Sequence, residues 1–495
     1  QTPTQDQDVP SITHTKARVD LPIAPAIQQH PHTTVSTDLL TVEISHKGGT
    51  VQNALLNAYP EELDGIKKFQ LLSNKAGGLF QAQSGLLPQE QMPTHHSIFT
   101  SSNNNYQLNG ETLTAPFKWK SDNGIEVVKN FHFKRGSYVI TVDYVVTNNS
   151  NKELTLSSYT QLVRNALDES NMMMPTFTGG AKFDDQDVYE KIEFDDFSSE
   201  PKTTSKGGWT AMIQHYFLAA VVPNKGDNPT LYTDIQSHDR YAIGAVLPIV
   251  TVAAGDSSDL SIQIYSGPKD QDRLEELAEG LELTVDYGWL TFLAQPIFWT
   301  LKQIQSVVIN WGFSIVLLTI LIKLIFFKLS ETSYRSMARM RKLSPRLASL
   351  KERFGDDRQK MNEAMMKMYK EEKVNPMGGC LPILVQIPVF IALYWVLLES
   401  VEIRQAPFML WIQDLSAKDP YYILPLIMGA SMMIQQKLNP APIDPIQQKV
   451  MMVLPVVFTV FFAFFPAGLV LYWVVNNIIS ISQQWYITKK IEAAN

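Results

Sequence analysis

The chain has 495 residues, of which 45% are hydrophobic, and a formal net charge of −7. Its only cysteine, Cys380, excludes an internal disulfide and a cysteine-based metal centre. No GxxxxGK[ST] loop indicates a nucleotide-driven motor, and no feature predicts specific binding of nucleic acid.

Residues 1–36 are polar and contain five prolines, with no helical or strand period. Such a composition predicts a linker. The chain begins at Gln1 without an apolar, positively charged signal, so we expect an export or anchor segment to precede it.

Residues 37–285 are predicted to form one large antiparallel β-sandwich. Polar and apolar residues alternate, for example over 138–146 and 260–265, and turn signals rich in Gly and Asn separate the alternating stretches. Leucines at 274, 277 and 281 predict an amphipathic helix that ends near Asp286 and closes this domain. His95 and His96 are interpreted as a surface pair, and no metal site is predicted.

Residues 286–310 are predicted to hold an amphipathic helix in the membrane interface. Its apolar face would consist of Ile297, Leu301, Ile304 and Val308.

Residues 311–495 are predicted to form a helical membrane core. Five apolar runs are long enough to be membrane spans, and they cover about 311–329, 377–398, 421–437, 450–465 and 467–485. The last two are separated because residues 450–482 exceed one span, and Phe-Pro-Ala-Gly at 465–468 predicts the turn. Both are short, which indicates either a locally thinned bilayer or helices continued by Gln435, Gln436, Gln483 and Gln484.

Residues 330–373 are predicted to form a cytoplasmic helical hairpin, with a first break at Ser344-Pro345 and a second at Gly355. Lys328 to Lys373 contains 13 basic and 7 acidic residues, whereas residues 401–420 contain two basic residues. Because short cytoplasmic loops are enriched in Lys and Arg, this difference places the β-domain on the outer side of the membrane.

Lys323 is the one ionisable residue inside the five predicted spans and away from their ends. All nine histidines lie at or before His238, so the relay expected of a proton-coupled transporter is missing from the spans. Either Lys323 snorkels to the headgroups, or it lines a wet cavity together with Thr319, Gln386 and Asn476. The amides of Gln386, Asn476 and Asn477 would alternatively serve as hydrogen bonds between helices.

Four prolines are predicted to loosen the spans, because each removes a backbone hydrogen bond: Pro382, Pro388, Pro425 and Pro455. Loosened helices would suit a bundle that opens sideways, although proline is common in membrane helices in any case.

Methionines form an apolar stripe on the predicted hairpin, at Met337, Met340, Met361, Met365 and Met368. Flexible methionine suits a surface that contacts varied apolar substrates. The alternative is that the stripe is the packing seam between the two arms of the hairpin.

Several motifs resemble the YidC/Oxa/Alb family of membrane protein insertases. They are VNPMGGCLP at 374–382, RQAPF at 404–408, DPYYILP at 419–425 and FPAGLVLYW at 465–473. KGGW at 206–209 is similar to the large periplasmic domain of the Gram-negative branch, so the resemblance covers nearly the whole chain.

The resemblance implies an inner-membrane protein with a periplasmic β-supersandwich and a five-helix core around a hydrophilic groove. Lys323 occupies the position of the family's groove arginine, and Gln386 and Trp473 match other groove residues. Thr319, Tyr472 and Asn476 are assigned to the same groove. The family's first span would lie before Gln1.

The function implied is that of an insertase and chaperone, which is not an enzyme and needs no cofactor. It would take hydrophilic parts of nascent membrane proteins into a positively charged groove and release their apolar segments into the lipid bilayer without ATP. Implied partners are the ribosome and the Sec translocon. The alternatives are a passive channel or transporter, and a receptor with an extracytoplasmic β-sandwich as its ligand domain.

Overall fold

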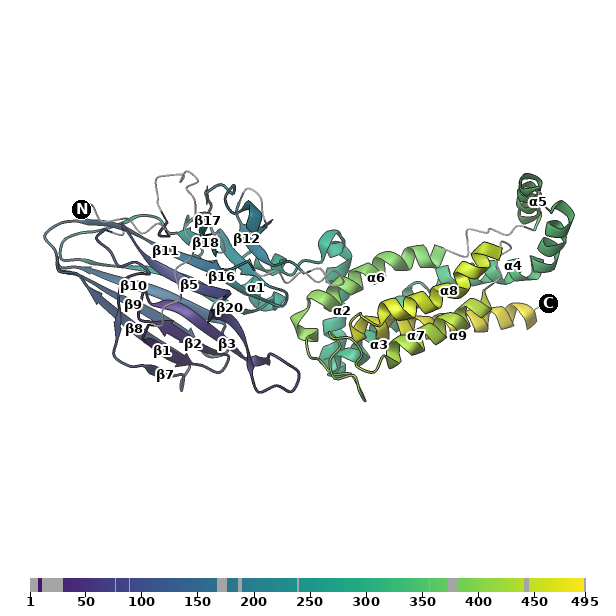
Figure 1. Cartoon of the computed structure of the whole chain (residues 1–495), viewed down its shortest axis with the longest axis horizontal. Helices are drawn as coiled ribbons and strands as arrows, with labels where there is room; N and C mark the ends of the chain where they lie inside the picture. Colours follow the sequence, from purple (N-terminus) through teal and green to yellow (C-terminus); the bar gives the residue numbers. More distant parts are fainter. Residues whose placement is uncertain are drawn as a thin grey trace. The chain divides into compact units, whose positions relative to one another are not determined.

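The computed structural model describes residues 8–10, 30–75, 77–88, 90–166, 176–185, 189–237, 240–355, 357–372, 381–439 and 445–493. The chain divides into two compact units, Gln1–Val285 and Asp286–Asn495. Strands form the first unit and helices the second (Figure 1).

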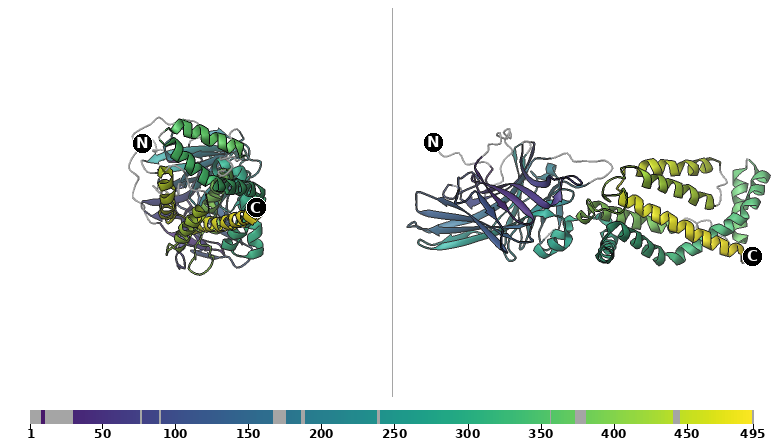
Figure 2. Two further views of the ribbon diagram at one scale, coloured as in Figure 1. Left: turned by 90° about the vertical axis from the view of Figure 1, so that its right-hand side faces the viewer. Right: turned by 90° about the horizontal axis from the view of Figure 1, so that it is seen from below.

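Unit 1 contains two sheets, and their strands are also seen from below in the right-hand view of Figure 2. The 11-stranded sheet has the order β14 (Thr203–Thr204), β17 (Thr230–Ser237), β18 (Arg240–Val246), β11 (Leu154–Arg164), β5 (Gly78–Leu87), β4 (Lys68–Lys75), β3 (Thr50–Pro60), β2 (Leu40–Ser45), β1 (His32–Ser36) and β7 (Asn105–Gln107), with β19 (Val250–Val252) paired to β11.

The 9-stranded sheet has the order β13 (Glu190–Ile192), β12 (Gly179–Phe183), β15 (Trp209–Ile213), β16 (Phe217–Val222), β20 (Ser257–Pro268), β10 (Val139–Asn148), β9 (Ile125–Lys134), β8 (Thr112–Lys120) and β6 (Thr100–Ser101). In strands such as β9 and β10, alternate side chains enter the core, because successive residues of a strand face opposite sides. In β10 the buried apolar residues are Ile140, Val142, Tyr144 and Val146, whereas β15 and β16 are buried along their whole length. The prediction of a large sheet-rich domain is confirmed, and the pairing of β1 with β7 is an exception to its antiparallel character.

The predicted linker, residues 1–36, is wrong at its end, because His32–Ser36 is strand β1. Thr33 and Val35 are buried, so this short stretch has the alternation of a strand despite its polar composition. Residues 1–7 and 11–29 of the predicted linker lie outside the described residues.

Two further predictions for unit 1 need correction. The helix expected to end near Asp286 is α1, Gln271–Leu277, followed by a 3-10 turn at Leu281–Thr284. Gly280, in a left-handed conformation with φ of +76°, separates the two. His95 is buried, with 3% of its surface exposed, so it is not part of a surface pair.

Unit 2 consists of eight helices among its described residues: α2 (Thr291–Val308), α3 (Trp311–Ile325), α4 (Phe327–Phe354), α5 (Arg358–Glu371), α6 (Leu381–Glu399), α7 (Ile423–Leu438), α8 (Pro445–Phe462) and α9 (Ala467–Ala493). Helix α9 contacts α3, α4, α6 and α7, and α8 lies against α7 (Figure 1). The chain turns between Phe462 and Ala467, at the predicted Phe-Pro-Ala-Gly segment. Gln483 and Gln484 lie within α9, which continues well past them.

Within the described part of the chain, no helix taken singly has both the length and the apolar character needed to cross a membrane. Trp311–Ile325 and Phe327–Leu343 meet that criterion as a pair, with a bend of 67° between them. The predicted span 311–329 is therefore broken near Phe326, four residues before the expected start of the hairpin.

The two arms of the hairpin are α4 and α5. Helix α4 continues through Pro345, so the break predicted at Ser344-Pro345 is wrong. It ends before Gly355, whose φ of +43° stops the helix, and Asp357 then caps α5 by accepting a hydrogen bond from the Lys360 amide.

Helix α2 buries the side that was expected to face lipid. Ile297 and Leu301 are buried in unit 2, where α2 contacts α3 and α6. Phe292 and Trp299, which are seven residues apart on another side of the helix, are 72% and 64% exposed. The apolar face predicted from the sequence is therefore the packing face, and these aromatic residues form the exposed one.

Candidate functional site

A row of polar residues runs along one side of α9 and forms the centre of the candidate site. Asn476, Ser480 and Gln484 follow one another at intervals of four residues, so they share a face of the helix. Ser480 and Gln484 are buried, with 8% and 2% of their surface exposed. Apolar helices surround this row, so each of its polar atoms needs a partner inside the unit.

Lys323 of α3 joins this row. Its side chain is buried, and its Nζ donates a hydrogen bond to Oγ of Ser480 over 2.7 Å. Ser480 in turn donates to the backbone oxygen of Asn476 over 2.8 Å. The ammonium group therefore points into the helical unit, and the snorkelling interpretation of Lys323 is wrong.

The charge of Lys323 is not balanced by a carboxylate in the part of the chain that the structure describes. Among the described side chains, no Asp or Glu forms an ion pair with Lys323, whereas lysines on the hairpin such as Lys360 do have acidic partners. The hydroxyl of Tyr334 on α4 also hydrogen-bonds to Ser480. A cation bonded only to neutral groups leaves a local excess of positive charge, which favours binding of an anionic group.

Helices α6, α7 and α9 are linked by amide hydrogen bonds. Gln386 Nε2 donates to Asn476 Oδ1 over 2.9 Å, and Asn477 Nδ2 donates to Ser431 Oγ over 2.9 Å. The interpretation of these amides as hydrogen bonds between helices is therefore confirmed. Whether the same groups line a groove stays a prediction.

Thr319 is buried but turns towards its own helix. Its Oγ1 donates to the backbone oxygen of Ile315 over 2.7 Å. This local bond is the usual one for a threonine inside a helix. Thr319 thus lies one turn from Lys323 without taking part in the network of Ser480 in the contacts that the structure gives.

Tyr472 and Trp473 belong to an aromatic cluster. The ring of Trp473 meets that of Phe390 edge to face, with 4.8 Å between their centres, and Tyr472 stacks on the same ring at 6.2 Å. The Nε1 atom of Trp473 is buried without a hydrogen-bond partner among the residues that the structure describes. Such a donor is available to an acceptor on an incoming chain.

Several members of this polar network were missed by the sequence analysis. They are Ser480, Tyr334, Ser431, Gln435 and Gln484. In the last two, Nε2 of Gln435 donates a hydrogen bond to Oε1 of Gln484 over 2.5 Å. The spacing of Asn476, Ser480 and Gln484 was a signal that could have identified the face of α9. No comparable signal relates Tyr334 to Ser480, because the two lie far apart in the sequence.

The four prolines do not act alike. Pro388 and Pro455 lie inside α6 and α8, where each removes a hydrogen bond of the helix. Pro425 is the third residue of α7, and an amide there has no partner within the helix, so the prediction that it loosens the helix is wrong. Pro382 is the second residue of α6 as described and follows the undescribed residues 373–380.

The methionines of the predicted stripe are buried or half-buried on α4 and α5. Met368 on α5 is buried, and Met337, Met340, Met361 and Met365 are half-buried. Contacts between α4 and α5 accompany this burial. The placement supports a packing seam, while contact of the same residues with substrates stays a prediction.

Large apolar side chains cover the outside of unit 2. Helix α8 is the clearest case, with Val450, Met452, Val453, Leu454, Val456, Val457, Val460 and Phe461 all exposed. Helices α3, α6 and α7 also expose apolar residues, among them Leu324, Leu384 and Leu426. Many exposed large apolar residues on one set of helices are typical of contact with lipid or with another protein.

The chain is similar to known proteins along nearly its whole length. Residues 303–494 match the family described as 60Kd inner membrane protein, and residues 32–300 match the YidC periplasmic domain. The membrane protein insertase YidC of Ruthia magnifica subsp. Calyptogena magnifica is 61% identical, over 97% of this chain and 89% of that relative. The YidC of Methylobacillus flagellatus is 53% identical, over 94% and 86%. A solved structure of an active YidC insertase covers 93% of both chains, with 17% sequence identity and a TM-score of 0.43.

Proposed function

Since the chain belongs to the YidC family of membrane protein insertases, we propose that it inserts nascent membrane proteins into the inner membrane by way of the polar row around Lys323. It is an inner-membrane protein with a periplasmic domain. The hydrophilic part of a substrate enters beside Lys323 while its apolar segment passes into lipid.

One observation carries this proposal. Lys323 is buried, bonded to the neutral Ser480, and has no acidic partner among the described residues. Burying a charge is costly unless something compensates for it, so an uncompensated lysine is retained for a use. An acidic or polar stretch of substrate supplies the missing partner.

The route into lipid follows α6 and α8. Pro388 and Pro455 weaken these two helices, and most of the surface of α8 is exposed and apolar. A substrate helix that leaves the polar row between them exchanges contacts with protein for contacts with lipid tails.

The substrate supplies the free energy. A span needs about 20 apolar residues, and each Leu, Ile, Phe or Val near its centre gains about 0.3–0.6 kcal/mol on insertion. Ten such residues yield roughly 3–6 kcal/mol, enough to drive insertion without ATP. The role of the insertase is to lower the barrier for the hydrophilic part, and a chaperone role follows if it holds helices before they are released.

The topology proposed is that of five spans, made by α3, α6, α7, α8 and α9, with α4 and α5 as a cytoplasmic hairpin. The boundaries are those of the sequence analysis: a linker over 1–36 that β1 now shortens, a periplasmic domain over 37–285, an interfacial helix over 286–310 and an insertase core over 311–495. The exposed apolar residues of these helices support lipid contact. The hairpin is the expected contact for a ribosome or for the Sec translocon, because residues 328–373 carry 13 basic residues against 7 acidic ones.

The proposal is tested by replacing Lys323 and measuring insertion of a single-span substrate in proteoliposomes. We expect Lys323→Ala and Lys323→Glu to lower insertion, with Glu the more harmful, and Lys323→Arg to keep most of it because the charge remains. Lys328→Ala, an exposed lysine nearby in the sequence, is the control. Unchanged insertion for both Ala and Glu would overturn the attraction step.

A further measurement separates insertion from the alternatives. A passive channel would conduct ions or solutes through the same proteoliposomes in the absence of substrate, and an insertase would not. A receptor would bind a ligand through unit 1, and insertion would then be indifferent to Lys323.

A further inference from the structure

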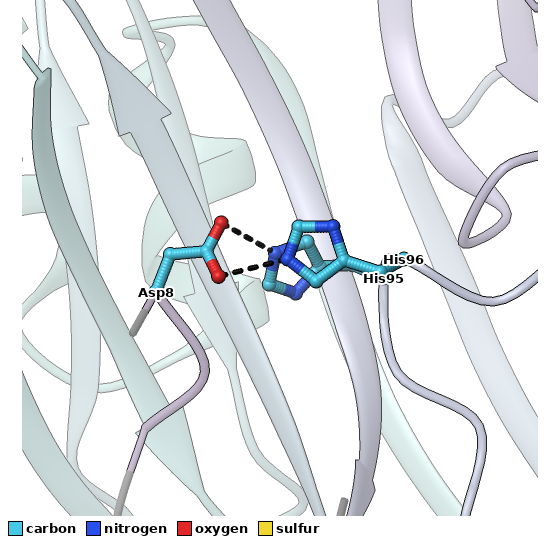
Figure 3. A group of neighbouring side chains, drawn as sticks. All are labelled: Asp8, His95 and His96. Atoms are coloured by element: carbon cyan, nitrogen blue, oxygen red, sulfur yellow. Dashed lines mark hydrogen bonds and ion pairs between the residues drawn. The ribbon is translucent and has the colours of Figure 1, made fainter. Parts of the chain in front are cut away.

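One carboxylate and two imidazole side chains, both common types of metal ligand, meet on unit 1, far from Lys323 in the sequence. The carboxylate of Asp8 faces the neighbouring rings of His95 and His96 from one side, with one oxygen directed at each ring (Figure 3). Oδ1 is 2.8 Å from Nε2 of His96, and Oδ2 is 3.3 Å from Nε2 of His95. The centres of the two rings are 4.1 Å apart.

The carboxylate is delivered to this position by its neighbours in the chain. Val9 is buried against Leu87 and Tyr159, which holds the segment against β5 and β11. The backbone oxygen of Asp8 accepts from Gln236 Nε2 over 3.4 Å and from Gln161 Nε2 over 3.5 Å. The backbone of Asp8 and the side chain of Val9 therefore anchor the segment next to the carboxylate.

His95 is oriented by a second partner. Its Nδ1 lies 2.6 Å from the hydroxyl of Tyr159, and its backbone amide donates to the same oxygen over 3.3 Å. Tyr159 is completely buried, so its ring is held by the core. A histidine that binds a metal through one nitrogen commonly bonds through the other to such a group, which fixes the orientation of the ring.

We propose that Asp8, His95 and His96 bind one divalent transition-metal ion of the zinc class. Imidazole nitrogen and carboxylate oxygen are both zinc ligands, at distances of about 2.0–2.2 Å from the ion. Two ligand atoms at that distance and in tetrahedral directions lie about 3.3 Å apart. The separations of 2.8 and 3.3 Å between the carboxylate oxygens and the ring nitrogens are close to that value.

Binding needs a change of tautomer in each ring and a turn of one hydroxyl. With Asp8 ionised and no metal bound, a hydrogen on Nε2 of each ring would bond to Asp8, and the hydroxyl of Tyr159 would donate to Nδ1 of His95. With the ion bound to Nε2, each ring would carry its hydrogen on Nδ1 instead, and His95 would donate that hydrogen to the oxygen of Tyr159, whose own hydroxyl hydrogen would turn away from the ring. A solvent molecule completes four ligands, because Asp8 and His96 are each about a third exposed, at 34% and 31% of their side chains.

The ion would fasten the segment around Val9 to the sandwich. A carboxylate from residue 8 and a histidine pair from residues 95–96 would be joined by metal bonds in addition to hydrogen bonds. Binding of an ion to the folded form alone stabilises that form, so the attachment would depend on the metal concentration outside the cytoplasm.

The direct test is zinc binding by the whole purified protein in detergent, without an affinity tag and stripped of metal by a chelator. Competition with a chromophoric zinc indicator measures the affinity. We expect one equivalent to bind, and His96→Ala and Asp8→Asn each to weaken binding at least tenfold. These two residues are preferred to His95 because their partial exposure makes their replacement compatible with folding.

The matched control is His132→Ala. His132 lies on β9, where its Nδ1 bonds to Oγ1 of Thr114 over 2.8 Å, and it takes no part in the cluster. The zinc affinity of the His132→Ala variant should equal that of the unmodified protein. Tyr159→Phe should weaken binding about 10–100-fold, because it removes only the orienting group.

Visible absorption of Co²⁺ bound in place of zinc provides a second measurement, because tetrahedral Co²⁺ absorbs visible light more strongly than hydrated Co²⁺. A signal that appears in the unmodified protein and is lost in His96→Ala would support the site. Failure of the unmodified protein to retain zinc through gel filtration, or equal affinity in His96→Ala, Asp8→Asn and His132→Ala, would overturn the proposal.

Discussion

Nζ of Lys323 and Oγ of Ser480 are 2.7 Å apart and join α3 to α9, although 157 residues separate them in the sequence. Both groups are buried in an apolar setting, so each satisfies the other. The contact fixes where the positive charge lies, beside a serine whose hydroxyl also bonds to the backbone oxygen of Asn476.

Ser480→Ala should destabilise unit 2, because it leaves the buried ammonium without this acceptor. We expect a loss of about 1–3 kcal/mol, the cost of an unsatisfied buried polar group. Thermal unfolding of the purified protein in detergent measures it. Ser482→Ala is the control, since Ser482 is exposed and bonds only to its own helix. Equal stability of the two variants would show that the hydrogen bond from Lys323 to Ser480 does not contribute to the stability of unit 2.

Gln386 and Asn476 should be coupled in a double-mutant cycle. Their side chains bond over 2.9 Å between α6 and α9. We expect the Gln386→Leu and Asn476→Leu changes to show an interaction free energy of about 0.6 kcal/mol, the average for hydrogen bonds between membrane helices. Strict additivity would mean that the bond does not hold α6 in place.

Gly280→Ala should be more damaging than Gly136→Ala. Both glycines are left-handed, with φ of +76° and +71°, so alanine strains either backbone by about 1–2 kcal/mol. At Gly280 the added carbon would also overlap the ring of Phe183, which stacks on Trp209, whereas at Gly136 no atom lies within 4 Å. Overpacking adds about 1–3 kcal/mol. Equal losses, measured by chemical unfolding of unit 1 in the whole chain, would contradict this expectation.

Asp143→Asn should stabilise the β-domain at neutral pH. Burial raises the pKa of Asp143, and the like charge of Asp259 on β20 raises it further. Since the pKa is higher in the folded state, the ionised group opposes folding at neutral pH, and the penalty disappears as the pH falls through the folded pKa and below 3.8.

The gain in stability from Asp143→Asn should be small, because Asp143 is only partly buried. We expect Tm to rise by about 1–3 °C at pH 7. The gain should vanish as the pH falls below 3.8. Asp122→Asn, in an exposed turn, is the control. A gain for Asp143→Asn that persists at low pH would show that charge is not its cause.

The proposed topology predicts which cysteines can be labelled from outside. In a Cys380→Ser background, Ile66→Cys should react with an impermeant maleimide in spheroplasts, because Ile66 is 96% exposed on unit 1. Glu352→Cys on α4 should react only after the membrane is opened. Labelling of Glu352→Cys in intact spheroplasts would reverse the orientation argued from the basic residues.

Local pattern was enough to predict much of the architecture. Alternation of polar and apolar residues identified the strands of unit 1, and apolar runs identified α3, α6, α7, α8 and α9, because both periods follow from backbone geometry alone. The turn after Phe462 could also be predicted from Pro466 and Gly468. The errors came where tertiary contacts prevail, as at Pro345, which lies inside a helix, and at His32–Ser36, which pairs with neighbouring strands.

The sequence by itself determined that one lysine would lie within the apolar helices and that amides and aromatic residues would accompany it. Only the tertiary structure decided that Lys323 turns inward to Ser480, that Gln386 meets Asn476, and that Asp8 contacts both His95 and His96. The physical reason is distance along the chain. A helix or strand depends on neighbours a few residues away, whereas these contacts require the whole core to bring remote segments together.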